Sequence, residues 1–334
     1  MKLIIQIPCL NEEKTLGETL ADLPHKIEGV DVIETLVIDD GSTDGTYELA
    51  KKLGVNHIVK LETNHGLARA FMRGLDRALN EGADIVVNTD ADNQYNGADI
   101  PKLVAPIVAD HADVVVGCRP IVDHPEFHPI KKVLQLAGSW LLRKVSQTTV
   151  RDAASGFRAM SRTTCLRLFT YTRFSYCMET LIQAGSLGLR IHSADIGVNP
   201  KTRESRLFKS VPEYLMKTGS TILYMFILYR PGRFFGLLGT ALLSVTFLLG
   251  LRFLALTYWL PNPDSERTYI PSLILAAITG LAGVTSIFAG FLGEVMQSQR
   301  RMSEENLFLQ RAARYGEGKR SRLRILKNIL DSSQ

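Results

Sequence analysis

Two long uncharged runs near the C-terminus constrain the fold of this chain of 334 residues more than any other feature. Arg233 and Arg252 enclose 18 uncharged residues, and Arg267 and Glu294 enclose 26. Because a helix of about 20 apolar residues spans a bilayer, we expect two transmembrane helices over 234–260 and 270–295, within a membrane region 233–297. Buried helices of a soluble protein are the alternative, which the apolar residues on all faces disfavour.

Charges beside these runs predict how the hairpin is oriented. Arginines precede the first run at 230 and 233 and follow the second at 300 and 301, whereas the loop Pro261–Tyr269 carries two acidic residues and one arginine. The positive-inside rule places such flanks in the cytoplasm. We therefore expect a multi-pass protein of the inner or cell membrane, with the N-terminal domain and both termini cytoplasmic. The start Met1–Ile5 is typical of a strand, not of a signal peptide.

The formal net charge of +5 comes largely from these flanks and from the basic tail 298–334. The expected partner of such charges is the lipid bilayer, not nucleic acid, although a solvated helical face would look the same. The four cysteines, Cys9, Cys118, Cys165 and Cys177, lack the spacing of metal ligands and are expected to be buried reduced thiols.

Residues 1–210 alternate between apolar strands and amphipathic helices. The strands are expected at Leu3–Ile7, Thr35–Ile38, His57–Leu61, Ile85–Asn88 and Val114–Gly117, and the helices at Asn11–Leu23, Thr43–Leu53 and Gly66–Asn80. This rhythm predicts an α/β domain, a mostly parallel sheet with helices on both faces. The amphipathic segments Pro129–Val145 and Val211–Tyr229 would lie on the membrane surface or on the domain itself, and 211–232 is expected to be a juxtamembrane helix.

Polar clusters follow several of these strands. They are Pro8–Glu12, Asp39–Asp44, Asp90–Gln94 and Arg119. Ligands of parallel sheets bind at the carboxyl ends of the strands, so the clusters predict one site. Asp90, Asp92 and Gln94 offer hard oxygen ligands for Mg²⁺ or Mn²⁺ on a diphosphate. A turn or helix cap is the alternative for this motif alone. There is neither a GxGxxG after the first strand nor a GxxxxGK[ST] anywhere in the chain.

Read in order, the motifs resemble those of a known family. They are Ile7-Pro8-Cys9-Leu10-Asn11-Glu12-Glu13, Val37-Ile38-Asp39-Asp40-Gly41-Ser42, Asn64-x-Gly66, Asp90-Ala91-Asp92-Asn93-Gln94, Val116-Gly117-Cys118-Arg119 and Asp152-Ala153-Ala154-Ser155-Gly156-Phe157-Arg158. This series resembles the GT-A domain of family 2 glycosyltransferases, a Rossmann-like mixed sheet with flanking helices. With the hairpin, the chain resembles the polyisoprenyl-phosphate glycosyltransferases, the group of dolichol-phosphate mannose synthase and undecaprenyl-phosphate glucosyltransferase.

The resemblance implies roles for single residues. The donor nucleotide and its diphosphate would contact Pro8, Leu10, Glu12, Ile38, Asp40, Asp90, Ala91, Asp92, Arg119, Arg203 and Lys209, and the catalytic residues would be Asp152, Arg119, Arg158 and Arg203. Asp40 is placed before Asp39 and Asp44 as an acceptor for a base imino group. Asp152 is either a general base or a group that positions Arg158 or Arg151. The loop Lys201–Lys209 departs from the family, since it lacks a glycine and has Arg206 where a lysine is common.

The implied activity is an inverting, metal-dependent hexosyl transfer from a nucleotide sugar to a polyprenyl phosphate. UDP-glucose is the first choice of donor, with GDP-mannose and other UDP-sugars open. A processive polysaccharide synthase is one alternative, disfavoured because the chain has no Gln-x-x-Arg-Trp motif and two spans are few for a polymer channel. A catalytically silent membrane adaptor is the other. Related enzymes can associate through their membrane helices, which leaves a homo-oligomer open.

Overall fold

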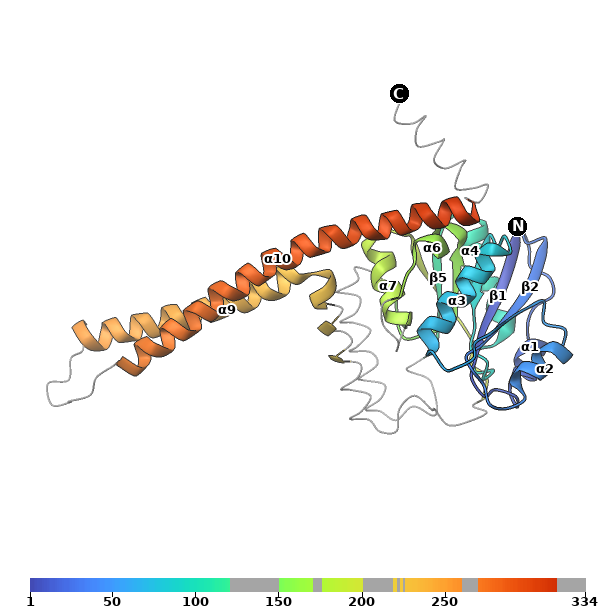
Figure 1. The fold of residues 1–334 in the computed structure, drawn as a ribbon, viewed down its shortest axis with the longest axis horizontal. Coiled ribbons are helices and arrows are strands. Elements are labelled where there is room, and N and C mark those ends of the chain that lie inside the picture. The colour runs from blue at the N-terminus through green and yellow to red at the C-terminus, as the bar shows by residue number, and fades with distance from the viewer. Residues whose placement is uncertain are drawn as a thin grey trace, which may run out of the picture. The chain divides into compact units, whose positions relative to one another are not determined.

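The computed structural model describes residues 1–120, 150–170, 176–200, 219–220, 223–224, 226–259 and 270–316. The chain divides into two compact units. The first combines Met1–Gly219 with Glu304–Gln334, and the second is Ser220–Ser303 (Figure 1). The segment Pro129–Val145, most of Val211–Tyr229 and the tail beyond Gly316 lie outside the described residues.

A single sheet is the centre of the first unit. Its strands are β1 Lys2–Cys9, β2 Val32–Asp39, β3 His57–Lys60, β4 Ile85–Asn88, β5 Val114–Cys118, β6 Arg158–Ser161 and β7 Ile191–Asp195. Their order is β3-β2-β1-β4-β6-β5-β7. Neighbouring strands pair in parallel, except that β6 runs antiparallel to both β4 and β5. The mostly parallel sheet predicted from the sequence is therefore confirmed.

Helices pack on both faces of this sheet, as predicted: the core beside Leu3 and Ile5 lies on one face, and Gly74 packs against Gln6 on the other. They are α1 Leu16–Ala21, α2 Thr46–Lys52, α3 Leu67–Asn80, the 3₁₀ turn η1 Gly97–Asp99, α4 Ile100–Val108, α6 Arg162–Arg167 and α7 Tyr176–Ser186. Odd-numbered β1 residues such as Leu3 and Ile5 share a fully buried core with Leu16 of α1 and Leu103 of α4. Each such side chain contributes about 1.5–3 kcal/mol by leaving water. All four cysteines are free and buried, as expected.

Two helices begin later than the sequence predicts. The helix expected to open at Asn11 begins at Leu16, and the helix expected at Thr43 begins at Thr46. The reason is that Asn11 adopts a left-handed φ of 56°, while its side-chain carbonyl accepts a hydrogen bond from the Thr43 amide at 2.8 Å. The residues between each strand and its helix thus form two loops that bind each other.

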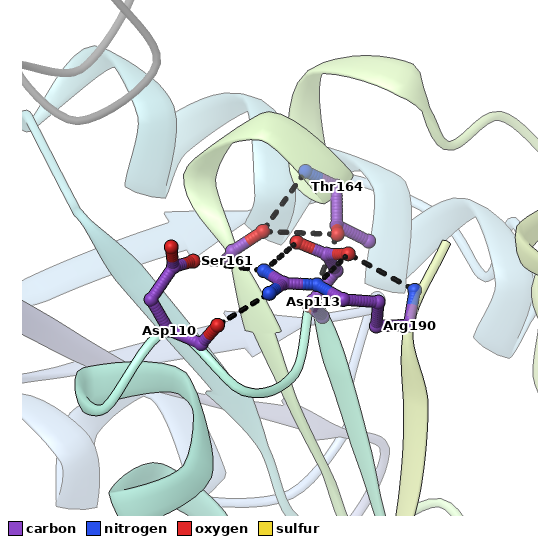
Figure 2. A network of polar contacts seen from close by, with 5 residues as sticks. All are labelled: Asp110, Asp113, Ser161, Thr164 and Arg190. Atoms are coloured by element: carbon purple, nitrogen blue, oxygen red, sulfur yellow. Dashed lines mark hydrogen bonds and ion pairs between the residues drawn. The ribbon is translucent and has the colours of Figure 1, made fainter. Parts of the chain in front are cut away.

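The edge strand β7 is fastened to β5 through Arg190, which precedes it (Figure 2). The Arg190 guanidinium donates to both carboxylate oxygens of Asp113, at 3.0 and 3.1 Å, and to the Asp110 carboxylate at 2.8 Å. Behind this pair, Thr164 donates its hydroxyl to the Asp113 carbonyl at 3.0 Å and its amide to Ser161 at 3.3 Å. The amino ends of β5, α6 and β7 are therefore joined by one polar network.

Two long apolar helices form the second unit and pack together. They are α9 Pro231–Leu254, continued by a π-helical turn at Ala255–Trp259, and α10 Ile270–Tyr315. Both are long and apolar enough to cross a membrane, with mean hydropathies of 2.1 and 2.0 in their most apolar stretches. Close packing depends on glycine, since a Cβ on Gly239 would lie 2.8 Å from the Gly283 carbonyl. Small residues at such contacts are typical of helices packed in lipid.

The last turns of α10 belong to the first unit. Arg311 is buried and donates to the Leu168 carbonyl at 2.7 Å and to the Asp76 carboxylate at 2.8 Å. In return, Arg162 of α6 donates to the Gly316 carbonyl at 3.1 Å. The segment 304–316 is therefore an integral part of the α/β unit.

Candidate active site

The sheet topology gathers most of the predicted motifs along one edge. β1, β2, β4 and β5 run in the same direction, so the residues that follow them lie along the carboxyl edge. β6 runs the other way and pairs Arg158 with Asn88. The segment before β6, which contains Gly156, therefore reaches the same edge as Asp90. The antiparallel direction of β6 therefore brings the motif Asp152–Arg158 to the site.

The loops after β1 and β2 form one end of the site. Pro8 pairs with Ile38 in the sheet, and both are buried, while Leu10 is partly buried. Glu12 is also buried. Its carboxylate accepts from the Thr15 hydroxyl at 2.9 Å, and its amide donates to the Thr46 hydroxyl at 2.9 Å.

The two adjacent aspartates after β2 have different surroundings. Asp40 accepts from the amides of His65 and Gly66 at 2.8 and 2.9 Å, one on each oxygen. It thereby holds the loop that opens α3, where Gly66 has a φ of 93°. Asp39 Oδ1 accepts from the Ser42 amide at 2.9 Å, whereas its buried Oδ2 has no hydrogen-bond partner among the described residues. Such an oxygen is costly unless something binds it.

The Asp90–Gln94 segment follows β4 directly. Asn93 adopts a left-handed φ of 54°, which turns the chain back on itself. Gln94 then donates two hydrogen bonds to the Asp92 carboxylate, one from its backbone amide at 3.3 Å and one from its side-chain NH₂ group at 2.9 Å. The Ala91 carbonyl accepts from the Thr19 hydroxyl at 3.0 Å. Gln94 thus orients the Asp92 carboxylate, and α1 holds the turn from the other side.

The donor set of this segment fits a divalent cation shared with a phosphate ligand. Asp90 and Asp92 supply two hard carboxylate groups. Among the residues that the structure describes, no group of three or more His, Cys, Asp or Glu side chains could hold a metal ion. Mg²⁺ and similar ions are commonly held by one or two carboxylates, with water and substrate phosphates completing the shell.

Arg119 and Asp152, two of the predicted catalytic residues, form a bidentate ion pair. Nε and Nη2 of Arg119 donate to the two oxygens of Asp152 at 2.7 and 3.1 Å. The Asp152 side chain is completely buried. Burial opposes the charge of Arg119, but Tyr95, Asp152 and Asp90 outweigh it and raise the pKa of the guanidinium. Arg119 is therefore a fixed cation beside the Asp90 segment.

Arg158, the third predicted catalytic residue, lies in the interior of the first unit. Its guanidinium donates to the carbonyls of Ala153, Ser155 and Cys177 at 2.9, 2.8 and 2.7 Å. It is 2% exposed. A further hydrogen bond goes to the Thr180 hydroxyl at 3.0 Å, so Arg158 holds the 153–155 turn against α7. Its catalytic role stays a prediction. Arg203 and Lys209 lie outside the described residues.

Three further residues at this edge were not predicted from the sequence. Asn88, Tyr95 and Tyr176 are buried and connect through Gly156. The one signal that could have found them is Asn88 itself, a polar residue that ends the apolar strand Ile85–Asn88. A buried amide requires partners, and those partners come from distant parts of the chain.

A mostly parallel sheet with an Asp-x-Asp turn at its carboxyl edge is the arrangement that the resemblance to GT-A glycosyltransferases predicts. The sequence pattern described as "Glycosyl transferase family 2" matches residues 4–169. The UDP-N-acetylglucosamine–dolichyl-phosphate N-acetylglucosaminyltransferase of Methanococcus voltae is 32% identical, over 67% of this chain and 92% of that protein. The dodecaprenyl-phosphate galacturonate synthase of Rhizobium johnstonii is 24% identical, over 89% and 88%. The chain belongs to glycosyl transferase family 2.

A solved structure supports the fold independently. The glucosyl-3-phosphoglycerate synthase of Mycobacterium tuberculosis, in complex with Mn²⁺, UDP and glucosyl-3-phosphoglycerate, matches with a TM-score of 0.51. The two chains are 22% identical, and the match covers 68% of this chain and 78% of that one. The predicted GT-A fold is thereby confirmed.

Proposed function

We propose that this protein transfers one sugar from a nucleotide sugar to a polyprenyl phosphate, with inversion at the anomeric carbon. The observation that carries the proposal is the Asp90–Gln94 turn beside the Arg119–Asp152 pair, in a chain that also has two helices long enough to cross a membrane. Two relatives, by their names, act on dolichyl phosphate and dodecaprenyl phosphate. Their acceptors are the reason for choosing a lipid phosphate here.

The nucleoside of the donor would lie over the ends of β1 and β2. Pro8, Leu10, Glu12 and Ile38 would line its site, as the family resemblance implies. Asp40 remains the predicted acceptor for the base. Its carboxylate oxygens would accept through the lone pairs that the hydrogen bonds from the His65 and Gly66 amides do not use. The unpartnered Oδ2 of Asp39 is a second acceptor next to it.

Asp90, Asp92 and the side-chain oxygen of Gln94 would hold Mg²⁺ or Mn²⁺ on the donor diphosphate, and the side-chain NH₂ of Gln94 would also orient Asp92. A divalent cation supplies charge neutralisation for the departing nucleoside diphosphate. The Mycobacterium tuberculosis synthase was solved with Mn²⁺ and UDP, which supports the choice of cation.

In the transfer, an oxygen of the acceptor phosphate attacks the anomeric carbon opposite the diphosphate. The bond from that carbon to the diphosphate oxygen breaks, and the nucleoside diphosphate leaves with the electron pair. A lipid monophosphate is already an anion near neutral pH, with a second pKa around 6. We therefore propose that Asp152 positions Arg119 and is not a base, because both of its oxygens already accept from the guanidinium.

Nη1 of Arg119 is not used in the pair with Asp152 and would bind a phosphate oxygen. Arg203 and Lys209 are further predicted phosphate contacts. We further propose that α9 and α10 cross the cell membrane and that the catalytic domain lies in the cytoplasm. UDP-glucose remains the first donor to test.

Substitution of Asp92 tests the proposal. We expect Asp92→Ala to reduce metal-dependent sugar transfer by about 100-fold or more, the scale of losing an electrostatic contact to developing charge. The readout is labelled sugar extracted with lipid from membranes supplied with polyprenyl phosphate. Asp195→Ala is the matched control, since Asp195 ends β7 at the same edge and is 78% exposed. Equal transfer by Asp92→Ala and the wild type would show that the metal assignment is wrong.

A further inference from the structure

A buried polar network lies directly behind the Asp90 turn. We infer that Asn88 and Tyr176 are positioning residues, which hold Gly156 against Asp90 and so fix the direction of its carboxylate. This inference rests on the proposed function, because it assigns the network to the site where the cation on the donor diphosphate would bind.

Asn88 is the centre of the network. It ends β4, two residues before Asp90, and is completely buried. Its side-chain amide donates to the Gly156 carbonyl at 2.9 Å and to the Tyr176 hydroxyl at 2.8 Å. Its side-chain carbonyl accepts from Gln6 Nε2 at 2.9 Å. Both amide hydrogens and the oxygen are used, so the orientation of Asn88 is fixed.

Tyr176 closes the network from α7. Its hydroxyl donates to the Gly156 carbonyl at 3.3 Å, and its ring stacks on Phe71 of α3, with the centroids 4.1 Å apart. Burial, together with Cys177 and Asp90, raises the pKa of this hydroxyl. Tyr176 therefore stays neutral and can donate at physiological pH.

Gly156 transmits this restraint to Asp90. A Cβ at position 156 would lie 3.1 and 3.3 Å from the two Asp90 oxygens and 2.8 Å from the Tyr176 oxygen. The Asp90 carboxylate therefore packs against the Gly156 backbone, with no room for a side chain between them. The Gly156 amide donates to the Tyr95 hydroxyl at 3.0 Å, and Arg119 lies over the Tyr95 ring, 6.0 Å from its centroid. Gly156, through its amide and its carbonyl group, thus joins the acidic turn to the Arg119–Asp152 pair.

The network could instead serve stability alone, and the test must separate these roles. Tyr176→Phe removes one hydroxyl and keeps the ring stacked on Phe71. Ser161→Ala is the matched control, because it removes a hydroxyl that accepts from the Thr164 amide at 3.3 Å in another part of the unit. Mn²⁺ binding is measured by electron paramagnetic resonance on the full chain in nanodiscs with UDP, and thermal unfolding is measured on the same samples.

We expect Tyr176→Phe to bind Mn²⁺ about 10-fold more weakly, as is typical when a group behind a metal ligand is lost. Ser161→Ala should lower thermal stability but bind Mn²⁺ like the wild type. Gly156→Ala should weaken Mn²⁺ binding further, because it displaces the carboxylate directly. Wild-type Mn²⁺ affinity in Tyr176→Phe would overturn the inference alone. A wild type that binds no Mn²⁺ with UDP would overturn the proposed function, and the inference with it.

Discussion

At the scale of single residues, the Arg119–Asp152 pair is the feature of the site that should be most sensitive to substitution. A buried ion pair is stable only while both partners are present, because removing one leaves an uncompensated charge. We expect Asp152→Asn to destabilise the protein by about 3 kcal/mol. Transfer should fall as well, since Arg119 loses the acceptor that orients it. Thermal unfolding and lipid-linked sugar formation measure the two effects.

The exposed pair between Arg151 and Asp195 provides the control. Its distance of 2.6 Å resembles that of the buried pair, but its side chains are 56% and 78% exposed. Solvent screening makes such pairs worth little, so Arg151→Gln should leave stability and transfer near wild type. Equal effects of Asp152→Asn and Arg151→Gln would contradict the special role of the buried pair.

Residue by residue, the sequence predicts acidic and basic groups better than their partners. Asp90 and Asp92 could be predicted because they directly follow an apolar strand and match a family motif. The buried position of Arg158 could not, because three of its acceptors are backbone carbonyl groups, which every residue type carries. Tyr176 was missed for a related reason, since its contact with Gly156 depends on how α7 packs and not on a local pattern.

At the scale of elements, a polar clamp joins the first three strands. Glu34 of β2 accepts from Lys2 of β1 at 2.7 Å and contacts Nε2 of His57 of β3 at 2.6 Å. Burial acts to raise the pKa of Glu34, but the hydrogen bonds from Lys2 and His57 outweigh it and lower the pKa. The folded state therefore favours the ionised carboxylate.

This clamp predicts a pH dependence of stability. A lowered carboxyl pKa stabilises the fold above the unfolded value of about 4.3, and the effect is lost as the pH falls through the lower folded pKa. Glu34→Gln should cost about 1.5–3 kcal/mol at pH 7, the scale of hydrogen bonds to charged groups. The difference from wild type should shrink at pH 3 in thermal unfolding.

The Glu48→Gln variant provides the reference, because Glu48 is 76% exposed and lies 3.9 Å from Lys51. It should match the wild type at both pH values. A stability difference for Glu34→Gln that is the same at pH 3 and pH 7 would contradict the clamp.

The elements themselves were largely predictable, because apolar strands between polar loops leave a strong periodic pattern. The strand Ile85–Asn88 has the predicted bounds. The starts of α1 and α2 were not predictable, because Asn11 and Thr43 bind each other across 31 intervening residues. The order of strands, with β6 antiparallel, likewise depends on contacts that no local segment contains.

At the scale of the whole molecule, α10 contributes to both compact units. Arg311 is the anchor of its last turns, and its loss would leave the Leu168 carbonyl without this donor. We expect Arg311→Met to lower the stability of the first unit by about 2 kcal/mol, the cost of an unsatisfied buried group. Faster hydrogen exchange in α3 would report it, because Asp76 of α3 is the other partner of Arg311.

Arg314 gives the comparison for this prediction. It is exposed and stacks over the Tyr315 ring, with its guanidinium carbon 5.2 Å from the centroid. Arg314→Met should leave hydrogen exchange in α3 unchanged. If Arg311→Met also leaves it unchanged, the last turns of α10 do not support the α/β unit.

The central claim is transfer of a sugar from a nucleotide to a lipid phosphate, and one measurement tests it directly. The purified full chain in bilayers is supplied with undecaprenyl phosphate, Mn²⁺ and a panel of labelled UDP- and GDP-sugars, and the lipid fraction is extracted. Our account predicts that label from one donor, UDP-glucose first, appears in a lipid monophosphate sugar in a metal-dependent reaction. Label that moves only to a water-soluble acceptor, or from no donor at all, would contradict it.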